Sequence, residues 1–338
     1  MGEFKGRIQE VETGGDNTRY EVLILQGDNS GKSVEVLIGQ DGLYPGLHTE
    51  YRKGEAVYLD IAHIGDEQIY SITGRDRIMP LGMLVVLFAV IAIVIGRKKA
   101  AGALVGLVIS ILVLFGLSIP LIVQGWSPII VVGVSLGLVL IPTMYLSHGL
   151  NPKTTTALIS TALVLVLAIL LGQLFIYLVG LTGLGTEDAQ TLMMQERSIT
   201  DFRGILLLSV IIGAVGVLDD VTVSQVASVQ EIFRANPKQT FVRLYNSAME
   251  IGRDHISSMV NTLVLAYVGS MLPLVLIFYS LGMSVGRIVS IEFIAEEITR
   301  MLVGSIALVL AVPIATFLAS YLITRPGKVD RWLDRHMT

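Results

Sequence analysis

Two adjacent carboxylates lie deep within a long apolar stretch of the chain. Asp219 and Asp220 belong to the segment 216–225, and the hydroxyl residues Thr222 and Ser224 follow them closely. A carboxylate at membrane depth costs several kcal/mol unless it is paired, hydrated or protonated. Neighbouring side chains on a helix point about 100° apart, so the two acids cannot share one narrow seam. The acids therefore indicate either a functional pathway or a pairing that fixes the helices.

A second polar stripe occupies the next apolar segment. Asp254, Ser258 and Asn261 follow one another at four- and three-residue steps, which places them on one face of a helix. At about 1.5 Å of rise per residue, Asp219 lies roughly 12 Å from the C-terminal end of its segment, near Ala227. Asn261 lies roughly 10 Å from the N-terminal end of the next segment, near Asp254, and a short connection joins these two ends. We therefore expect the two polar groups at similar depth, with Arg253 as a counter-charge or an anion contact.

Carboxylate, amide and hydroxyl oxygens are ligands that suit a hard cation such as Na⁺, Mg²⁺ or Ca²⁺. We expect a transport or ion-binding site in the inner half of the bilayer, with Asp219 and Asn261 as candidate ligands and the identity of a metal left open. The alternative is that an acid pairs with Arg253, or with an amide of another helix, and only locks the bundle. The residues assigned to the site are Asp219, Asp220, Thr222, Ser224, Asp254, Ser258 and Asn261.

An intramembrane hydrolase is a further alternative. An aspartyl type needs two carboxylates that face each other from different helices, and Asp219 or Asp220 could face Asp254. However, Asp254 lies at the end of its segment, and no motif of that class flanks it. The chain has no Cys and no HExxH motif, which excludes thiolate catalysis and a zincin-type site. We expect no enzymatic activity and no cofactor.

The composition indicates the elements that must position these residues. Only 15% of the chain is charged, against about 25% in a typical soluble domain. Residues 1–77 hold 14 acids and 8 bases, whereas residues 78–338 hold 14 acids and 16 bases in more than three times the length. The first block predicts a soluble acidic domain and the second a membrane domain. With a net charge of −4 and no basic face, the chain is not expected to bind nucleic acid.

The first block has the alternation and turn residues of short β-strands. The predicted strands are 4–11, 20–25, 33–38, 56–62 and 69–73. Five short strands in this length predict a small all-β domain, an OB-like barrel or a sandwich. Because the domain is acidic and shows no aromatic platform, it is predicted to be a structural or docking module.

The second block contains seven apolar segments, each long enough to cross about 30 Å of hydrocarbon. A backbone in lipid must satisfy its own hydrogen bonds, so we predict an α-helical integral membrane bundle of about seven helices over residues 78–323. Amphipathic stretches at 241–251 and 291–301 precede the last two segments. The predicted spans are about 78–96, 100–123, 128–147, 157–181, 204–227, 256–281 and 302–323.

The distribution of Lys and Arg predicts the orientation of the bundle. One set of loops, together with the tail 324–338, carries twelve basic residues, and the opposite loops carry four. Basic residues favour the cytoplasmic side, so the tail is predicted to be cytoplasmic and the β-domain to lie outside. A translocated β-domain without a signal peptide requires either that segment 78–96 acts as a reverse anchor or that a helix precedes this chain in the natural protein. We favour the preceding helix.

Several motifs give the chain a family resemblance. They are Asp219 and Ser224 within 213–225, Gly252-Arg253-Asp254, Met259-Val260-Asn261-Thr262-Leu263, Ala266-Tyr267-Val268-Gly269, Glu296-Glu297-Ile298, Arg300, Val303-Gly304-Ser305 and Ala311-Val312-Pro313. With the β-domain ahead of the helices, the sequence resembles the YibE/F-like family of bacterial membrane proteins over most of its length. The resemblance implies a multi-pass protein of the bacterial plasma (inner) membrane with a role related to transport. The resemblance makes Asp219 the stronger candidate of the two acids, because a second acid at Asp220 departs from the family pattern.

The sequence therefore predicts a membrane transporter or channel for a small ion or solute. Its expected partners are the lipid bilayer and that ion or solute, and the sequence also allows a homo-oligomer or a membrane partner. A membrane scaffold that recruits a partner through its β-domain is the first alternative, and the intramembrane hydrolase is the second. In the scaffold, the buried acids would only fix the packing.

Overall fold

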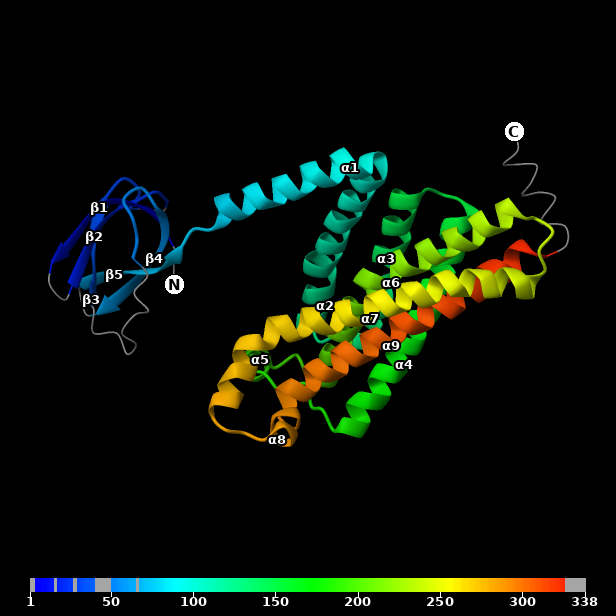
Figure 1. Ribbon diagram of the computed structural model, residues 1–338. Helices are drawn as coiled ribbons and strands as arrows, with labels where there is room; N and C mark the ends of the chain where they lie inside the picture. Colours follow the sequence, from blue (N-terminus) through cyan, green and yellow to red (C-terminus); the bar gives the residue numbers. More distant parts are fainter. Residues whose placement is uncertain (1–3, 15–16, 27–28, 40–49, 65–66, 326–338) are drawn as a thin grey trace. The chain divides into compact units, whose positions relative to one another are not determined.

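The computed structural model divides the chain into two compact units, Met1–Ile91 and Ala92–Thr338, and each is described by itself. Figure 1 draws the elements along the chain. The predicted tail 324–338 lies almost wholly outside the described residues. The structure describes residues 4–14, 17–26, 29–39, 50–64 and 67–325.

The first unit contains an antiparallel five-stranded sheet. Its strands are β1 (Phe4–Gly14), β2 (Asn17–Ile24), β3 (Ser33–Gly39), β4 (Ala56–Ile64) and β5 (Glu67–Arg75). They are ordered β3-β2-β1-β4-β5 across the sheet. All five predicted strands are confirmed, and most of them extend beyond the predicted ends because the hairpin pairings continue into polar residues.

Alternating apolar residues close the core of this sheet. Ile8, Val22 and Leu59 are at most 1% exposed, as expected of the inward face of a strand with a two-residue period. A Cβ atom at Gly6 would lie 2.6 Å from Val22 Cγ1 and 2.9 Å from Leu59 Cδ1, so only glycine fits where β1 crosses the core. The edge strands β3 and β5 also approach each other. This closure is what a small, partly open barrel of the OB type requires, as the sequence predicted.

Asp76 links the sheet to the first helix within this unit. Its carboxylate accepts the backbone N–H of Ile78 at 2.9 Å, which caps the start of the helix, and the ammonium of Lys5 in β1 at 2.9 Å. The N–H of Ile78, and after it the charge of Lys5, lower the pKa of the Asp76 carboxyl below its usual value. A lowered folded-state pKa means that the ionised carboxylate stabilises the fold.

We predict that Asp76 titrates below the ordinary aspartate pKa of about 3.9. Its stabilising contribution is complete above that value and is lost as the pH falls through the lower folded-state pKa. A ¹³C NMR titration of the full chain labelled at Asp measures this directly. Lys5→Met is expected to raise the pKa of Asp76, whereas the exposed Lys53→Met leaves it unchanged. An Asp76 that titrates at or above the ordinary value would contradict the assignment.

The remaining elements are helical. They are α1 (Ile78–Val113), a π-helical turn η1 (Leu114–Ser118), α2 (Ile119–Val123), α3 (Pro128–His148), α4 (Pro152–Val179), α5 (Glu187–Gln195), α6 (Phe202–Ala235), α7 (Phe241–Ser280), α8 (Val285–Val289) and α9 (Glu292–Ile323). Within the described residues, six helices are long and apolar enough to cross a membrane, by length and composition. The predicted class, an all-β domain followed by an apolar helical bundle, is therefore confirmed.

The first of these six helices covers two predicted spans. It runs as Ile78–Val123, and 46 residues are about 69 Å of helix, more than twice the thickness of a hydrocarbon core. Arg97 interrupts it with a backbone at φ 52° and ψ −134°, which is outside the helical region. The interruption falls at the basic residues that the sequence placed between its first two spans.

The core of the bundle is formed by α4, α6 and α9, with α7 alongside α6 and α9 (Figure 1). In the most apolar stretch of α6, half of the residues are buried within the bundle, and in that of α9 44% are buried. In the most apolar stretch of α7, none is buried. α6 is therefore the central helix, and α7 is a peripheral one along most of its length.

The two amphipathic stretches are the beginnings of longer helices. Residues 241–251 are the first turns of α7, and residues 291–301 lead into and begin α9. Leu244 and Ala248 are fully buried in one cluster with Phe233 of α6 and Ala319 of α9. The apolar stripe of this stretch thus packs on neighbouring helices, because α6 and α9 supply an apolar face at that end.

A buried amide joins α6, α7 and α9. Gln225 is completely buried, and its Nε2 atom donates to the carbonyl oxygen of Ala248 at 2.9 Å and to Thr316 Oγ1 at 2.8 Å. α7 approaches so closely because Gly252 has no side chain: a Cβ atom there would overlap Val312 Cγ1 and lie 3.0 Å from Gln225 Nε2. Low-dielectric surroundings strengthen such bonds and penalise their loss.

We predict that Gly252→Ala lowers the free energy of unfolding by about 1–3 kcal/mol, because the added methyl group overpacks this contact. Gly216→Ala is the matched control, since a Cβ atom at Gly216 meets nothing within 4 Å. The control is expected to raise stability by up to about 1 kcal/mol through helix propensity. Unfolding in mixed detergent micelles, followed by circular dichroism, compares the two variants. Equal effects would show that α7 does not pack this closely.

Candidate functional site

The two acids predicted from the sequence lie in the middle of α6. Asp219 is half-buried, and its Oδ1 atom accepts the backbone N–H of Asp220 at 3.0 Å. Asp220 is exposed and lies within electrostatic range of His148 at the end of α3. Among the residues that the structure describes, neither carboxylate forms an ion pair. The arrangement is that of two adjacent carboxyl groups in the middle of a long apolar helix, without an ion-pair partner among the described residues.

The hydroxyl residues after the acids make contacts within the bundle. Thr222 is fully buried, and its Oγ1 atom lies 2.7 Å from that of Thr161 on α4. Thr222 Oγ1 also donates to the carbonyl oxygen of Asp219 at 3.1 Å, and Ser224 Oγ donates to that of Val221 at 3.0 Å. Thr222 therefore joins α6 to α4, and both hydroxyl protons are committed inside the helix packing.

The backbone of α7 places the second stripe at the depth of the acids. The two helices run antiparallel: a Cβ atom at Gly213 would lie 3.0 Å from the hydroxyl of Tyr267, and Gly252 lies beside Gln225. Midway between these two contacts, Asp219 is level with residues 258–261 of α7. The two polar groups thus lie level with each other along the two helices.

The stripe nevertheless points away from α6. Gly252 is buried, and Ile256 and Met259 pack against the central cluster. At 100° per residue, Ser258 and Asn261 lie on the opposite side of the helix from this packing face, and both are exposed. The structure therefore does not bring Asn261 to Asp219 within one chain.

The charged residues that precede the stripe are exposed too. Asp254 lies on the outward face with Ser258, and its carbonyl oxygen accepts the hydroxyl of Ser258 at 3.1 Å. Arg253 is exposed and, in the described part of the chain, forms no ion pair with Asp219 or Asp220. The described residues also contain no group of three His, Cys, Asp or Glu side chains that could hold a metal ion.

The polar residues that join the bundle were missed in part by the sequence reasoning. Gln225 is the last residue of the segment 216–225, but nothing in the sequence pattern assigned a helix-joining role to it, to Thr161 or to Thr316. Their only sequence signal is that each interrupts an apolar span. A hydroxyl can bond to its own helix, so this signal does not distinguish Thr161, which reaches another helix, from Thr143, which bonds to the carbonyl oxygen of Val139.

Carboxylates also hold the end of the bundle where α9 begins. The Oε1 atom of Glu292 accepts both the backbone N–H of Thr182 at 2.6 Å and its hydroxyl at 2.5 Å. Glu296 is only 4% exposed and accepts the N–H of Gly185 at 3.2 Å. These carboxylates fix the loop after α4 to α9, so they have a structural role.

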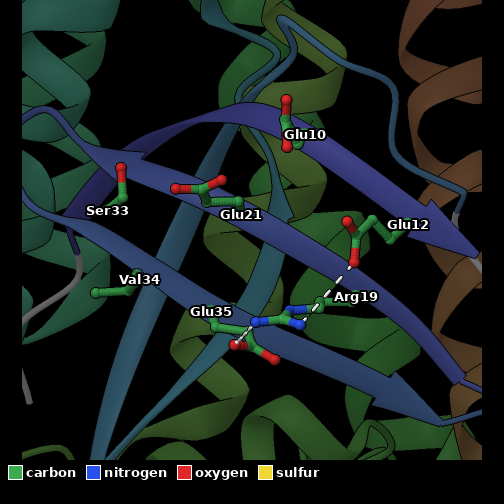
Figure 2. A pocket seen from close by; sticks show the side chains of 7 residues that line it. All are labelled: Glu10, Glu12, Arg19, Glu21, Ser33, Val34 and Glu35. Carbon is green, nitrogen blue, oxygen red and sulfur yellow. Dashed lines mark hydrogen bonds and ion pairs between the residues drawn. The ribbon is translucent and has the colours of Figure 1, made fainter.

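An acidic hollow lies on the face of the sheet in the first unit (Figure 2). It measures about 330 Å³ and is lined by Glu10, Glu12, Arg19, Glu21, Ser33, Val34 and Glu35. Arg19 lies among the acids, pairing closely with Glu35 and lying 3.9 Å from Glu12. The hollow is a charged, solvated surface whose only basic residue is already engaged.

A small sheet domain followed by helices long and apolar enough to cross a membrane defines an α-helical membrane protein. The chain belongs to the YibE/F-like protein family, whose match covers residues 84–325, from within α1 to just beyond the end of α9. No curated protein and no solved structure matches the chain. The family resemblance seen in the motifs is thereby confirmed.

We predict that Thr161 and Thr222 stabilise the bundle as a pair. In a double-mutant cycle of Thr161→Val and Thr222→Val, the coupling energy should be about 0.6 kcal/mol, the average for hydrogen bonds between membrane helices. Unfolding in mixed micelles supplies the four free energies. A coupling of zero would show that the hydroxyls do not bond to each other and would free Thr222 for another role.

Proposed function

We propose that this protein is a transporter or channel for a small ion or solute, with its site at Asp219 and Asp220 in the inner half of the bilayer. The observation that carries the proposal is the pair of carboxylates in the middle of α6 that have no ion-pair partner among the described residues. Charged groups inside a membrane are costly and commonly mark ion or proton pathways. A purely structural acid would be expected to be paired.

The surroundings of Asp220 support access from outside the bundle. On α6, Gly213, Gly216 and Asp220 follow at three- and four-residue steps, and all three are exposed. Gly216 has nothing within 4 Å of its Cβ position, which leaves room beside the backbone one turn before Asp220, whereas the Cβ position of Gly213 faces the hydroxyl of Tyr267 on α7. A hydrated cation could approach both carboxylates from this side and exchange water for carboxylate oxygens.

The residues of the α7 stripe do not line the proposed site together with Asp219. Asp254, Ser258 and Asn261 lie at a suitable depth but on the outward face of α7. They could contribute to the pathway only if that face is covered by further protein or by water. Thr222 and Ser224, whose hydroxyls are bonded within the bundle, would position α6 and would not coordinate an ion directly.

We further propose a location in the bacterial plasma membrane, with the sheet domain outside and the C-terminus in the cytoplasm. Twelve basic residues against four in the opposite loops support this orientation. The negative charge of the sheet domain would then raise the local concentration of cations outside.

We predict that Asp219→Asn combined with Asp220→Asn reduces flux at least about tenfold, a loss of about 1.4 kcal/mol of favourable charge interaction. The assay uses purified full-length protein in liposomes and measures Na⁺, K⁺, Mg²⁺ and proton flux separately. Asp188→Asn, an exposed acid in the first turn of α5, is the matched control and should leave flux unchanged.

The amide replacements keep the size of the acids, so loss of flux with an unchanged unfolding free energy would support the pathway. If the wild type conducts one of these ions and the double variant conducts it equally well, the proposal is wrong. If the variant instead changes only stability, the acids fix packing, as the scaffold alternative requires.

A further inference from the structure

The outward face of α7 is a continuous surface that no other described element covers. Its residues follow at alternating three- and four-residue steps, and those in the apolar half are widely exposed: Leu265 is 67% exposed, Val268 45% and Leu272 50%. The same line continues into Ser258 and Asn261, which are also exposed. This alternation is the spacing with which two helices pack together along their length. We call this line of residues, from Ser258 to Leu272, the seam.

Asn261 is the group on this seam that lacks a partner. The hydroxyl of Ser258 is satisfied by its own helix, through the carbonyl oxygen of Asp254. The amide of Asn261 forms no hydrogen bond with any residue that the structure describes, although it lies level with Asp219 in the middle of α6. An amide without a hydrogen-bond partner in hydrocarbon costs roughly 2–7 kcal/mol. The position of Asn261 therefore requires a polar neighbour.

We propose that a second copy of this chain covers the outward face of α7, and that the two Asn261 amides hydrogen-bond to each other across a two-fold axis. Two copies inserted in the same direction place each residue of the seam opposite its own counterpart. An amide carries both donors and an acceptor, so it is complementary to itself. Acidic or basic residues at this position would repel one another.

The rest of the seam suits the same partner. Leu265, Val268 and Leu272 present branched apolar side chains that interlock with identical ones, and a single polar residue among them sets the register. Asp254 continues the seam at its polar end, where the two carboxylates would face each other, and the exposed Arg253 beside it supplies a cation that offsets their repulsion. The proposal rests on α7 alone and does not depend on the transport function.

The chain contains no cysteine, so single cysteines test the contact without background. Leu265→Cys and Val268→Cys, introduced separately into the full chain in liposomes, are expected to form covalent dimers under mild oxidation. Leu163→Cys is the matched control, because Leu163 is 50% exposed on α4 and should give only the dimer expected from random collision. Equal cross-linking at all three positions, or none at 265 and 268, would overturn the proposal.

A second measurement isolates the amide. Asn261→Leu should weaken dimerisation about fivefold, which corresponds to about 1 kcal/mol, within the range known for hydrogen bonds between membrane helices. Gln173→Leu removes an exposed amide from α4 and should leave the dimer unchanged. Subunit counting by single-molecule photobleaching in liposomes gives both values, and circular dichroism confirms that the variants fold. A monomeric wild type, or α7 cysteines that cross-link in native membranes to a different protein only, would refute the second copy as the partner.

Discussion

The amide of Gln225 is the contact on which the arrangement of the helical unit depends. Its two donated hydrogen bonds reach the backbone of α7 at Ala248 and the hydroxyl of Thr316 on α9, and Gln225 itself is completely buried. The amide thereby fixes how far α7 slides along α6 and which side of α7 turns inward. Gly252 permits the close approach, and the pair Thr161–Thr222 ties α4 to the same region.

Once α7 is fixed in this rotation, its inward and outward sides have different roles. The inward side carries Gly252 and Met259 and is used for packing, so the outward side with Asn261 is left for something else. A polar stripe on a membrane helix must face protein or water, because lipid offers no hydrogen bonds. The rotation of one helix thus connects the internal packing of the bundle with the question of what lies beside it.

The acids of α6, Asp219 and Asp220, lie in the middle of that helix and form no ion pair with any described residue. Three carboxylates near the start of α9 are engaged: Glu292 and Glu296 accept hydrogen bonds from the loop after α4, and Glu297 pairs with Arg300 at 2.6 Å. Within the described part of the chain, the carboxylate of Asp219 accepts a hydrogen bond from the neighbouring backbone N–H of Asp220 and forms no ion pair. The contrast between engaged and unengaged carboxylates within the same bundle is what distinguishes a candidate pathway from structural polarity.

The sequence by itself determined the class of protein, the five strands and the apolar segments that form the long helices. These properties depend on local quantities, namely the period of apolar residues, the length of a segment and the rise per residue. The sequence did not determine that residues 241–280 form one helix, that Gln225 joins three helices, or that Asn261 faces away from Asp219. Those outcomes depend on the rotation of each helix about its own axis, which is decided by how Gly252, Gln225 and Thr316 fit together in space. A helix with polar residues on one face and small residues on the other can satisfy its own backbone in either rotation, so only the tertiary contacts select one of them.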